Sequence, residues 1–427
     1  MLNQNNYWWL KAVIYEVYVD KFAKDFKGFT KSLDYLEFLG VNTLWVLPHY
    51  PSPMVDGGYD VSDYCSVRSD LGTIEDFEDF VKAAHERGMK IIIDLVLNHT
   101  SSLHPWFLEA RSSKNSPKRD WYIWSEDVSK FSQAYVHFSD VKPSNWIKNE
   151  KTNDYYYATF YPQQPDLNWD NPQVYAAMLD VMRFWLKKGV DGFRLDAVSR
   201  IVKRDGTNCF ALPEVHNILK RIRSDISSEF SGTVFLAESG GWINEAKPFF
   251  GNGDECQLVI NFPFSANLLA STVDYDFSKA QKLWEESQGL SFDNRWAVFL
   301  TNHDSVDLFF LDEEQKRKIS KNGLLLSKYG NQEGTSFAAR LSEICSHNKE
   351  RIIWAYEKLL SLDCVPIIYY GNEIGMSNQS LDKKPFDLRE YVRGNFDWEE
   401  AERQISDQNS ILNNLRNLII KRRESIL

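Results

Sequence analysis

The stretch Gly189–Val198, GVDGFRLDAV, decides how the rest of the chain is interpreted. A long amphipathic helical pattern ends where it begins, and a short strand follows in which successive side chains point to opposite faces. Arg194 and Asp196 therefore share one face. Phe193 and Leu195 share the other face and can pack against a layer of helices. A cation beside a carboxylate at the end of an apolar strand indicates either a structural ion pair or a prepared site, and the stretch alone leaves both open.

Eight short apolar runs recur along the chain, separated mainly by segments long enough for a helix. They are Ala12–Val19, Thr43–Leu47, Lys90–Asp94, Gly192–Leu195, Val234–Ala237, Gln257–Ile260, Trp296–Leu300 and Val365–Tyr370. Continuous apolar runs indicate strands that are buried on both faces, as in a parallel sheet. Eight such units favour a (β/α)8 TIM barrel of the α/β class over a doubly wound sheet.

Helical patterns follow several of these runs. They are expected at Thr30–Leu39, at Thr73–Arg87 with Thr73 as N-cap and Gly88 as stop, from Asn171 and Pro172 onward, and at Ser410–Arg423. The connection between Lys90–Asp94 and the helix at Asn171 is too long for a βα loop. We therefore expect an inserted subdomain over residues 100–168, which divides the barrel into residues 1–99 and 169–427.

Composition narrows the class of protein. With 49 Lys and Arg against 60 Asp and Glu, the net charge of −11 argues against a nucleic-acid binder. No apolar stretch approaches the roughly 20 residues that a membrane helix needs. The start, MLNQNNYWWL, lacks the features of a signal peptide. Five cysteines without metal-ligand spacing predict free thiols and a cytoplasmic location, and 61 aromatic residues (14 Trp, 20 Tyr, 27 Phe) suit a cleft that stacks flat apolar ligands.

Polar residues follow five of the predicted strands, at the end of a barrel where active sites lie. They are Gly58–Asp60, Asn98–Thr100, Arg194 with Asp196, Glu238, and Asn302–Asp304. Three acids with two histidines and an arginine suit glycoside cleavage, in which a carboxylate attacks the anomeric carbon and a carboxylic acid protonates the leaving oxygen. We expect Arg194 to keep Asp196 ionised, and a less solvated Glu238 to have the raised pKa that an acid needs.

Five segments of the chain, DLVLNHTS, QPDLN, GFRLDAV, AES and TNHDS, resemble in this order the signature regions of the α-amylase family of retaining α-glucoside enzymes. Each is weak alone, but five in the correct order are very specific, and the resemblance runs from YEVYVDKF to RGNFDW. Within the family the chain most resembles trehalose synthases and related small-substrate α-glucosidases. The segments WFLEARSSKNSPKRDWYIWSE, DGTNCFALPEVH and FFGNGDECQ carry the likeness to trehalose synthases.

The resemblance implies a role for each of the three acids. Asp196 matches the nucleophile that forms a β-glucosyl enzyme, and Glu238 matches the general acid/base. Asp304 matches the third acid, which binds sugar hydroxyls and stabilises the transition state. Arg194 would orient Asp196. The family's calcium ion and any other cofactor are not expected to take part in this chemistry.

The resemblance also implies substrate-binding roles for residues that are unremarkable alone. His99 and His303 would bind hydroxyls of the sugar in subsite −1; alone they would more often be ordinary hydrogen-bonding histidines, and no third histidine suits a zinc site. Tyr59 would stack on that sugar, although a lone tyrosine is more often packing. Asp60 would bind the far edge of the sugar, held by Arg393, which by itself reads as a solvated surface charge.

Lys203 marks a departure from the metal site of the family. An Asn and an Asp that match Asn98 and Asp166 often hold calcium, and trehalose synthases add a Glu where this chain has Lys203. Some related α-glucosidases also have Lys there, and its ammonium replaces the ion. We therefore expect Lys203 to bridge Asn98 and Asp166 without calcium.

Other departures bear on the substrate. Endo-acting α-amylases carry a Lys-His pair where Ser199 and Arg200 stand, which disfavours long starch chains. Ala197 resembles enzymes that prefer α-1,4 over α-1,6 links. The segment Glu238–Trp242, ESGGW, differs from the trehalose-synthase pattern on the acceptor side. A small α-glucoside such as maltose, sucrose or trehalose is the expected substrate, and hydrolysis, transfer and isomerisation all stay open.

Two hypotheses remain. The leading one is a retaining enzyme acting on small α-glucosides. The alternative is a catalytically silent family member that serves as a carbohydrate-binding or assembly subunit; such relatives typically lose at least one acid, whereas Asp196, Glu238 and Asp304 all stand in context. The family's C-terminal β-sandwich has no counterpart in this sequence, and the oligomeric state is left open.

Overall fold

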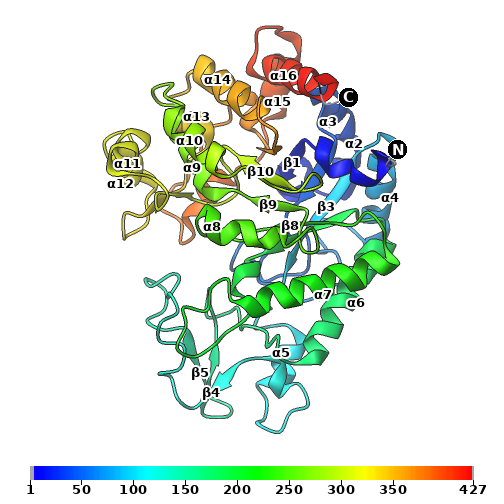
Figure 1. Ribbon diagram of the computed structural model, residues 1–427, viewed down its shortest axis with the longest axis vertical. Coiled ribbons are helices and arrows are strands. Elements are labelled where there is room, and N and C mark those ends of the chain that lie inside the picture. Colours follow the sequence, from blue (N-terminus) through cyan, green and yellow to red (C-terminus); the bar gives the residue numbers. More distant parts are fainter. Residues whose placement is uncertain (1–3, 426–427) are drawn as a thin grey trace.

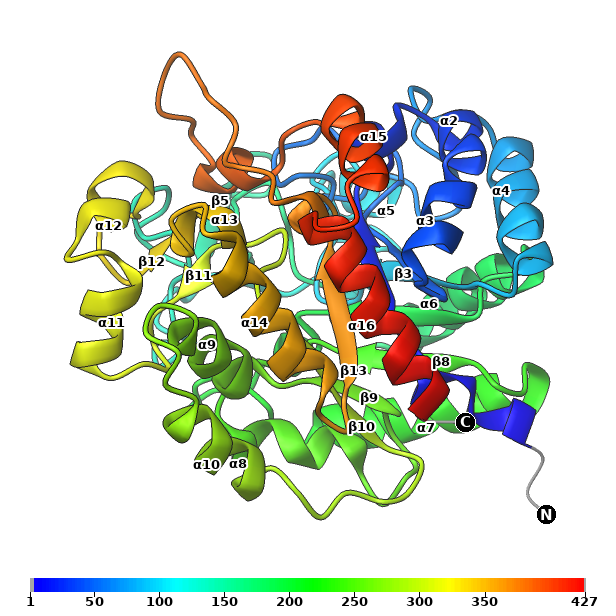
Figure 2. The same cartoon turned by 90° about the horizontal axis from the view of Figure 1, so that it is seen from above.

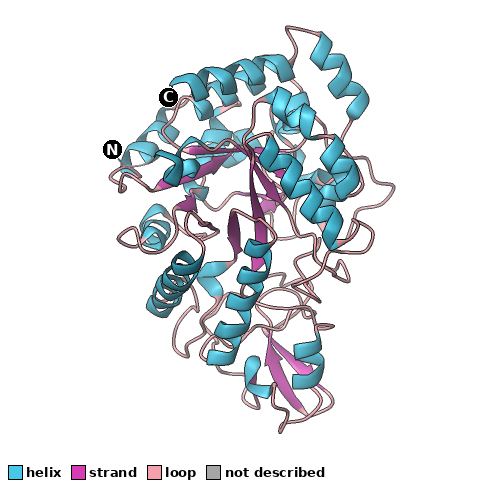
Figure 3. Ribbon diagram, turned by 90° about the vertical axis from the view of Figure 1, so that its right-hand side faces the viewer, coloured by secondary structure: helices cyan, strands magenta, loops and turns pink. Residues whose placement is uncertain are grey.

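A computed structural model describes residues 4–425 of the chain, and eight parallel strands close into a barrel at its centre (Figures 1 and 3). In order around the barrel the strands are β1 (Ile14–Val17), β2 (Thr43–Val46), β3 (Lys90–Val96), β7 (Gly192–Asp196), β8 (Val234–Ala237), β9 (Leu258–Ile260), β10 (Arg295–Phe299) and β13 (Val365–Tyr369). Each of the eight apolar runs matches one of these strands to within two residues at either end. The predicted TIM barrel is therefore confirmed.

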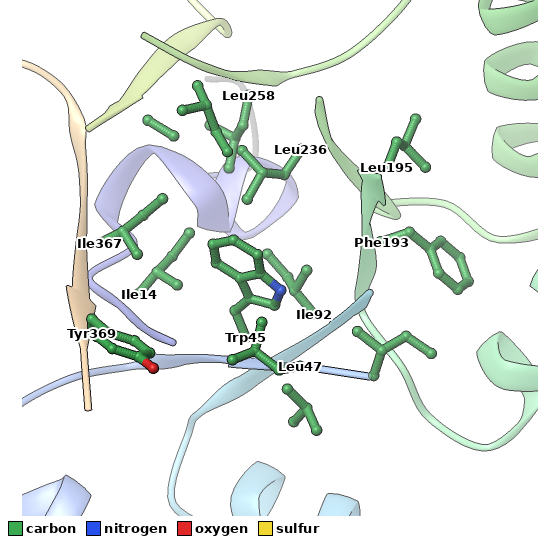
Figure 4. Close-up of a cluster of buried hydrophobic side chains, with 14 of the residues drawn as sticks. Ile14, Trp45, Leu47, Ile92, Phe193, Leu195, Leu236, Leu258, Ile367 and Tyr369 are labelled. Atoms are coloured by element: carbon green, nitrogen blue, oxygen red, sulfur yellow. The ribbon is translucent and has the colours of Figure 1, made fainter. Parts of the chain in front are cut away.

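Strand alternation separates a barrel interior from an outer shell. Figure 4 shows Trp45 in the interior with a ring of aliphatic side chains around it: Ile14, Ile92, Leu236, Leu258 and Ile367. Phe193 and Leu195 point the other way, toward the helices, and both are fully buried. The face-sharing predicted for β7 is thus correct, and it leaves Arg194 and Asp196 inside the barrel.

Helices accompany the strands and form the outer layer in Figure 3. They are α1 (Val19–Ala23), α2 (Phe26–Lys31), α3 (Leu33–Leu39), α4 (Ile74–Glu86), α6 (Pro172–Lys187), α7 (Pro213–Glu229), α8 (Ile243–Ala246), α9 (Phe262–Ser271), α10 (Ser278–Glu286), α14 (Lys349–Leu360), α15 (Trp398–Ser406) and α16 (Ile411–Ser425). Six 3-10 helices add η1 (Gln4–Lys11), η2 (Arg119–Trp121), η3 (Val198–Arg200), η4 (Lys247–Phe250), η5 (Asn372–Ile374) and η6 (Leu388–Val392). Figure 2 shows α14 and α16 packed beside each other.

Local signals explain two of these helices. Thr73 caps α4 as predicted, because its hydroxyl oxygen accepts from the backbone N–H of Asp76. The Asp76 carboxylate in turn accepts from the backbone N–H of Thr73, so two backbone N–H groups at the start of the helix have hydrogen-bond partners. The helix expected over Thr30–Leu39 is instead divided at Ser32. The Ser32 hydroxyl donates to the carbonyl of Gly28, a local bond that competes with continuation of the helix.

A segment between β3 and α6 leaves the barrel and forms its own small sheet, at the bottom of Figure 1. It contains α5 (Pro105–Ala110) and an antiparallel sheet of β4 (Trp124–Ser125), β6 (Asp154–Tyr157) and β5 (Trp146–Asn149), in that order. Two isolated bridges, His99 to Asp166 and Tyr122 to Leu167, lie at its base. We call residues 100–168 the insertion; those boundaries remain a prediction.

A second excursion, between β10 and β13, is not foreseen from the sequence. It contains β11 (Val306–Asp307), α11 (Glu313–Ile319), α12 (Leu324–Tyr329), β12 (Ser336–Phe337) and α13 (Leu341–Ile344), and α11 and α12 stand out at the left of Figures 1 and 2. Its two strands pair with each other and are two residues long, and Phe337 of β12 also forms an isolated bridge with Gly330. Such short strands give no apolar run to detect.

Across residues 4–425, no helix combines the length and the apolar character required to cross a membrane.

Candidate active site

The three predicted acids all follow strands at the same end of the barrel. Asp196 is the last residue of β7, Glu238 comes directly after β8, and Asp304 lies in the turn after β10. Parallel strands end at one rim, so residues far apart in sequence meet there. Asp196 is nearly buried, while the side chains of Glu238 and Asp304 are 20% and 31% exposed, which leaves them open to a ligand.

Arg194 is the centre of this arrangement, because its guanidinium contacts three carboxylates. One nitrogen, Nη1, donates to Asp94 Oδ1 at 2.5 Å and to Asp196 Oδ1 at 2.7 Å. The other, Nη2, lies 2.7 Å from Glu238 Oε1. In the β3–β7 ladder Arg194 is the register partner of Asp94, which explains that contact. The ion pair predicted between Arg194 and Asp196 is formed, and it extends to two further acids.

Three carboxylates around one guanidinium favour retention of a proton. Burial raises the pKa of Asp196 and of Glu238; Arg194 opposes the rise, and the neighbouring carboxylates add to it. The expected increase at Glu238 is therefore present, but Arg194 does not hold the pKa of Asp196 down as anticipated, because Asp94 and Glu238 compete for the same cation. Asp196 and Glu238 therefore titrate as interacting groups rather than independently.

The backbone after the nucleophile position is strained. Ala197 has a φ of 43°, in the left-handed region that residues with a side chain adopt at a cost. Its N–H donates to Glu238 Oε2 at 2.7 Å. The strained turn therefore ties the end of β7 to the acid that follows β8.

Asp304 contacts two guanidinium groups and an imidazole. Its Oδ1 lies 3.3 Å from Arg389 Nη1 and 3.4 Å from Arg393 Nη2, and its Oδ2 lies 3.3 Å from His303 Nε2. Burial alone would raise the pKa of Asp304, but His303 and the two arginines lower it below its usual value. Asp304 is thus held ionised, unlike the pair formed by Asp196 and Glu238.

Tyr59 and His303 form a stacked pair beside Arg194. Their rings are 5.4 Å apart and inclined by 13°, and Tyr59 Oη lies 2.7 Å from His303 Nε2. On its other side His303 Nδ1 lies 2.5 Å from Glu16, a buried acid on β1 that the sequence analysis does not single out. Tyr59 is only 4% exposed, so its ring is packed on His303 while its edge faces the site.

His99 is buried at the end of β3 with an unused ring nitrogen. Its Nδ1 lies 3.2 Å from the amide nitrogen of Asn98, while Nε2 has no hydrogen-bond partner within residues 4–425. Burial lowers the pKa of His99 to about 4, so the imidazole is neutral near pH 7. A neutral imidazole with a free nitrogen is suited to a hydroxyl group of a ligand.

Asp60 does not lie where the resemblance implies. Its carboxylate is fully buried and accepts from Ser52 Oγ at 2.9 Å and from the backbone N–H groups of Val55 and Asp56 at 3.0 and 3.1 Å. Within the described residues no contact joins it to Arg393. The expectation is wrong because loop amides, whose N–H groups need acceptors, occupy both oxygens of Asp60.

Asp56 takes the place expected for Asp60. Its Oδ1 lies 2.5 Å from Arg389 Nη2, and its Oδ2 accepts from Gln164 at 2.8 Å. Arg393 instead donates to the carbonyl of His303 at 3.0 Å and approaches Asp304, so it is buried at the site rather than solvated at the surface. Arg389 bridges Asp56 and Asp304 and is a second guanidinium that the sequence analysis misses.

Lys203 lies between the two positions that often hold calcium in the family. Its ammonium is 2.6 Å from Asn98 Oδ1 and 2.5 Å from Asp166 Oδ2, and it also donates to the carbonyl of Arg200. The ammonium already satisfies these oxygens, so the donor set does not suit a calcium ion. Among the residues that the structure describes, no group of three or more His, Cys, Asp or Glu side chains is arranged to hold a metal.

Aromatic side chains stand exposed at the rim. Trp242, in the loop that follows Glu238, is 39% exposed, and Phe309, in the excursion after Asp304, is 63% exposed. Their ring centroids are 5.8 Å apart. Two neighbouring exposed rings, inclined by 49° to each other, offer an apolar surface of the kind that the composition suggested.

Sequence signals exist for some of the residues that were missed. Asp56 precedes Tyr59 in the Gly-rich loop, and Arg389 precedes Arg393 in a segment with two basic residues. Each signal is ambiguous, since Asp56 and Asp60 both lie close to Tyr59, three residues before it and one residue after it. Glu16 sits in an apolar run and gives no signal of a partner across the barrel.

Comparison with known proteins gives relatives over most of the chain. A trehalose synthase/amylase of Mycobacterium tuberculosis is 38% identical over 386 residues, which cover 87% of this chain and 63% of that protein. A trehalose synthase of Thermus thermophilus is 41% identical over 379 residues, which cover 87% of this chain and 39% of that protein. An oligo-1,6-glucosidase of Heyndrickxia coagulans is 31% identical over 435 residues, which cover 96% and 74%. The chain thus spans less than two thirds of these two trehalose synthases.

Solved structures share the fold over nearly the whole chain. A trehalulose synthase, MutB, in complex with Tris superimposes with a TM-score of 0.78 at 26% identity, covering 98% of this chain and 84% of that one. An isomaltulose synthase of Erwinia rhapontici in complex with its natural substrate sucrose gives 0.78 at 27% identity, with the same coverage. The protein-family model described as "Alpha amylase, catalytic domain" matches residues 17–425 of this chain. The chain therefore belongs to the α-amylase family.

Proposed function

We propose that the protein is a retaining enzyme that acts on small α-glucosides of the maltose, sucrose or trehalose class. The single observation that supports this most directly is the sharing of Arg194 by Asp196 and Glu238, with Asp304 held ionised beside them. Retaining glycoside cleavage needs a carboxylate nucleophile and a carboxylic acid together, and a pair that shares one proton supplies both.

In the first step a carboxylate oxygen of Asp196 forms a bond to the anomeric carbon. The bond from that carbon to the leaving oxygen breaks, and Glu238 gives its proton to that oxygen. The product is a β-glucosyl ester on Asp196. Arg194 stabilises the carboxylate before attack, and its positive charge then remains to pair with the newly ionised Glu238.

In the second step Glu238 takes a proton from an acceptor hydroxyl, whose oxygen attacks the same carbon and releases Asp196. Water as acceptor gives hydrolysis, a second sugar gives transfer, and the retained sugar attacking through another hydroxyl gives isomerisation. Relatives named trehalose synthase and oligo-1,6-glucosidase, and structures named trehalulose and isomaltulose synthase, support a small substrate without choosing the acceptor.

The substrate-binding roles belong to the same proposal. Tyr59, His99 and His303 would contact the sugar that reacts, and Asp56 with Arg389 would hold its far edge. A cytoplasmic location is also proposed, and it is supported by five cysteines that are all free thiols. Lys203 is proposed to replace a structural calcium ion.

Asp196→Ala is the test of the mechanism. We expect turnover of every α-glucoside to fall by roughly 10⁴-fold or more, because no other group attacks the anomeric carbon. Purified protein is incubated with maltose, sucrose, trehalose and maltotetraose, and products are resolved by chromatography and anomer-sensitive NMR. Asp180→Ala, which changes a 76% exposed aspartate on α6, is the matched control and should leave turnover unchanged.

The product pattern assigns the reaction. Glucose that is first released as the α-anomer indicates hydrolysis with retention, and a new disaccharide indicates transfer or isomerisation. Inverted product, or turnover that survives Asp196→Ala, would contradict the mechanism. No turnover of any sugar by the wild type would favour the silent, sugar-binding alternative.

A further inference from the structure

Glu16 lies inside the barrel on β1, and no step of the proposed reaction uses it. Its Oε1 lies 2.5 Å from Nδ1 of His303 and 3.2 Å from the backbone nitrogen of the same residue. A backbone N–H only donates, so Oε1 accepts at that contact. The other oxygen, Oε2, is buried and has no hydrogen-bond partner within residues 4–425. The hydrogen bonds of the Glu16 carboxyl group therefore all go to His303.

The far side of the His303 ring faces Asp304 and Tyr59. Nε2 lies 3.3 Å from Asp304 Oδ2 and 2.7 Å from Tyr59 Oη. Asp304 is held ionised by two guanidinium groups, so a bare lone pair on Nε2 would face a carboxylate, whereas an N–H there is attracted to it. Tyr59 Oη also accepts from Arg194 at 3.3 Å and can donate its own hydrogen to Asp94 at 3.3 Å. A hydrogen on Nε2 therefore suits both neighbours, since it can point to Asp304 Oδ2 and Tyr59 Oη while Tyr59 gives its own hydrogen to Asp94.

A hydrogen on Nε2 determines whether Nδ1, the other ring nitrogen, carries one. Neutral imidazole carries one hydrogen, so Nδ1 is then an acceptor, and Oε1 of Glu16 must bring the hydrogen of that short contact. A carboxylic acid oxygen can do this while it accepts from the backbone N–H of His303. Burial raises the pKa of Glu16 well above its usual value and lowers that of His303, which agrees with a neutral acid beside a neutral imidazole.

We propose that Glu16 is a positioning residue that holds the second proton of a Glu16–His303 pair and so keeps Nε2 of His303 a hydrogen-bond donor toward a bound sugar. The inference rests on the proposed function, because the sugar is the substrate of that function. Glu16 would in this way give β1 a role in the site without itself contacting the substrate. A sugar hydroxyl that lies beside both Nε2 and Asp304 Oδ2, which are 3.3 Å apart, would accept from His303 and donate to the carboxylate.

Glu16→Gln tests this with almost no change of shape. An amide oxygen facing His303 only accepts, so it forces the hydrogen onto Nδ1 and leaves Nε2 bare. An amide nitrogen facing His303 only donates, so it opposes the backbone N–H. Neither orientation reproduces the carboxylic acid. We expect kcat/KM for the best α-glucoside to fall by about 10- to 100-fold, with a folded protein, because one hydrogen bond to a charged site is lost.

Glu373→Gln is the matched control. Glu373 is equally buried, accepts from Tyr15 Oη at 2.6 Å and Tyr35 Oη at 3.0 Å, and also has an unpartnered Oε2 among the described residues. An amide oxygen can accept both of those bonds. We expect Glu373→Gln to retain kcat/KM within about threefold, so a fall confined to Glu16→Gln is not a general cost of a buried amide.

Nitrogen NMR on histidine-labelled protein reads the proton arrangement without any need for activity. The chain has eight histidines, and His303→Gln assigns the signal of His303. We expect the Nε2–H tautomer in the wild type and the Nδ1–H tautomer in Glu16→Gln. A wild type with Nδ1–H would overturn the inference even if Glu16→Gln failed to fold, and so would a Glu16→Gln variant with wild-type kcat/KM.

The two proposals fail separately. A wild type that turns over α-glucosides but carries the Nδ1–H tautomer overturns the role of Glu16 and leaves the proposed function standing. A wild type with the Nε2–H tautomer that turns over no α-glucoside supports the proton arrangement and overturns the proposed function.

Discussion

At the scale of single residues, two groups of charges with opposite balance meet at the rim. Arg194 contacts three carboxylates, whereas Asp304 contacts two arginines and a histidine. A surplus of carboxylates retains a proton, and a surplus of cations excludes one. The pKa of a carboxyl group is therefore raised at Glu238 and lowered at Asp304 because of its surroundings.

The exchange of Asp56 for Asp60 leads to a prediction with two readouts. Asp56→Asn removes the charge that pairs with Arg389, so we expect kcat/KM to fall by about 10- to 100-fold with little change in melting temperature. Asp60→Asn weakens a carboxylate that accepts three bonds within its loop, so we expect a loss of about 1–3 kcal/mol in the free energy of unfolding. Steady-state kinetics and chemical unfolding measure both variants.

Each aspartate variant is the control for the other, since both make the same change in the loop around Tyr59, three residues before it and one residue after it. Asp56→Asn should have the lower activity of the two variants, and Asp60→Asn should have the lower stability. If Asp60→Asn lost the activity while Asp56→Asn behaved like the wild type in both assays, the role first expected for Asp60 would be correct after all.

Residue identities at the strand ends could be predicted, but their partners could not. Arg194 and Asp196 were paired correctly because strand alternation places them on one face. Asp94 and Glu16 also alternate inward, yet Asp94 meets Arg194 on the neighbouring strand and Glu16 meets His303 in the turn after β10, and such pairings are not encoded in local spacing. The loop after β2 shows the same limit, because which of Asp56 and Asp60 turns inward depends on loop amides.

At the scale of elements, the insertion is joined to the barrel through one buried ion pair. Lys203, in the loop after β7, reaches Asp166 at the end of the insertion and Asn98 at the end of β3. The Asp166 carboxylate also accepts from Thr159, both from its backbone N–H at 2.9 Å and from its hydroxyl at 2.5 Å. One ammonium thus links three segments that are distant in sequence.

Lys203→Met removes this charge at nearly constant volume. We expect the free energy of unfolding to fall by about 3–5 kcal/mol, because the Asp166 carboxylate stays buried without its cation. Thermal and chemical unfolding measure the change. Lys148→Met alters a 46% exposed lysine in β5 of the same insertion and should cost no more than about 1 kcal/mol.

A chelator distinguishes a site occupied by the Lys203 ammonium from a site occupied by a metal ion. The melting temperature of the wild type should be the same with and without EDTA, because the oxygens of Asn98 and Asp166 are already bonded to Lys203. Lys203→Glu would offer an additional carboxylate, a ligand that calcium prefers, and added calcium should then raise a lowered melting temperature. A wild type that loses stability in EDTA would refute the replacement of calcium by Lys203.

Long elements with strong patterns were predicted well, and short ones were not. All eight barrel strands and the capped helix α4 follow from apolar runs, alternation and a Thr cap. The β11–β12 pair and the break at Ser32 do not, because a two-residue strand has no period and a single hydroxyl decides the break. The elements that were missed lie mostly in the connections, where function is added to the fold.

At the scale of the whole molecule, the barrel supplies the acids and its longest connections surround them. The insertion follows β3 and the second excursion follows β10, and the two approach each other where Glu333 accepts from Ser139 at 2.5 Å. Trp242 and Phe309 belong to the same rim. The acceptor in the second step must enter past these connections, so the rim decides between water and a sugar.

Trp242→Ala tests whether the exposed rings hold a sugar acceptor. Stacking on an aromatic ring contributes about 0.5–1.5 kcal/mol, so we expect the acceptor concentration needed for half-maximal transfer to rise roughly twofold to tenfold. Hydrolysis should increase relative to transfer, while cleavage of the donor changes little, because Trp242 contacts none of the three acids. Product ratios at increasing maltose concentration measure the effect. Phe292→Ala alters a ring that is 61% exposed just before β10, at the opposite end of the barrel, and should leave the ratio unchanged. Equal ratios in the wild type and Trp242→Ala would show that the rings at the rim do not bind the acceptor, and the choice between water and sugar would then belong to groups nearer Glu238.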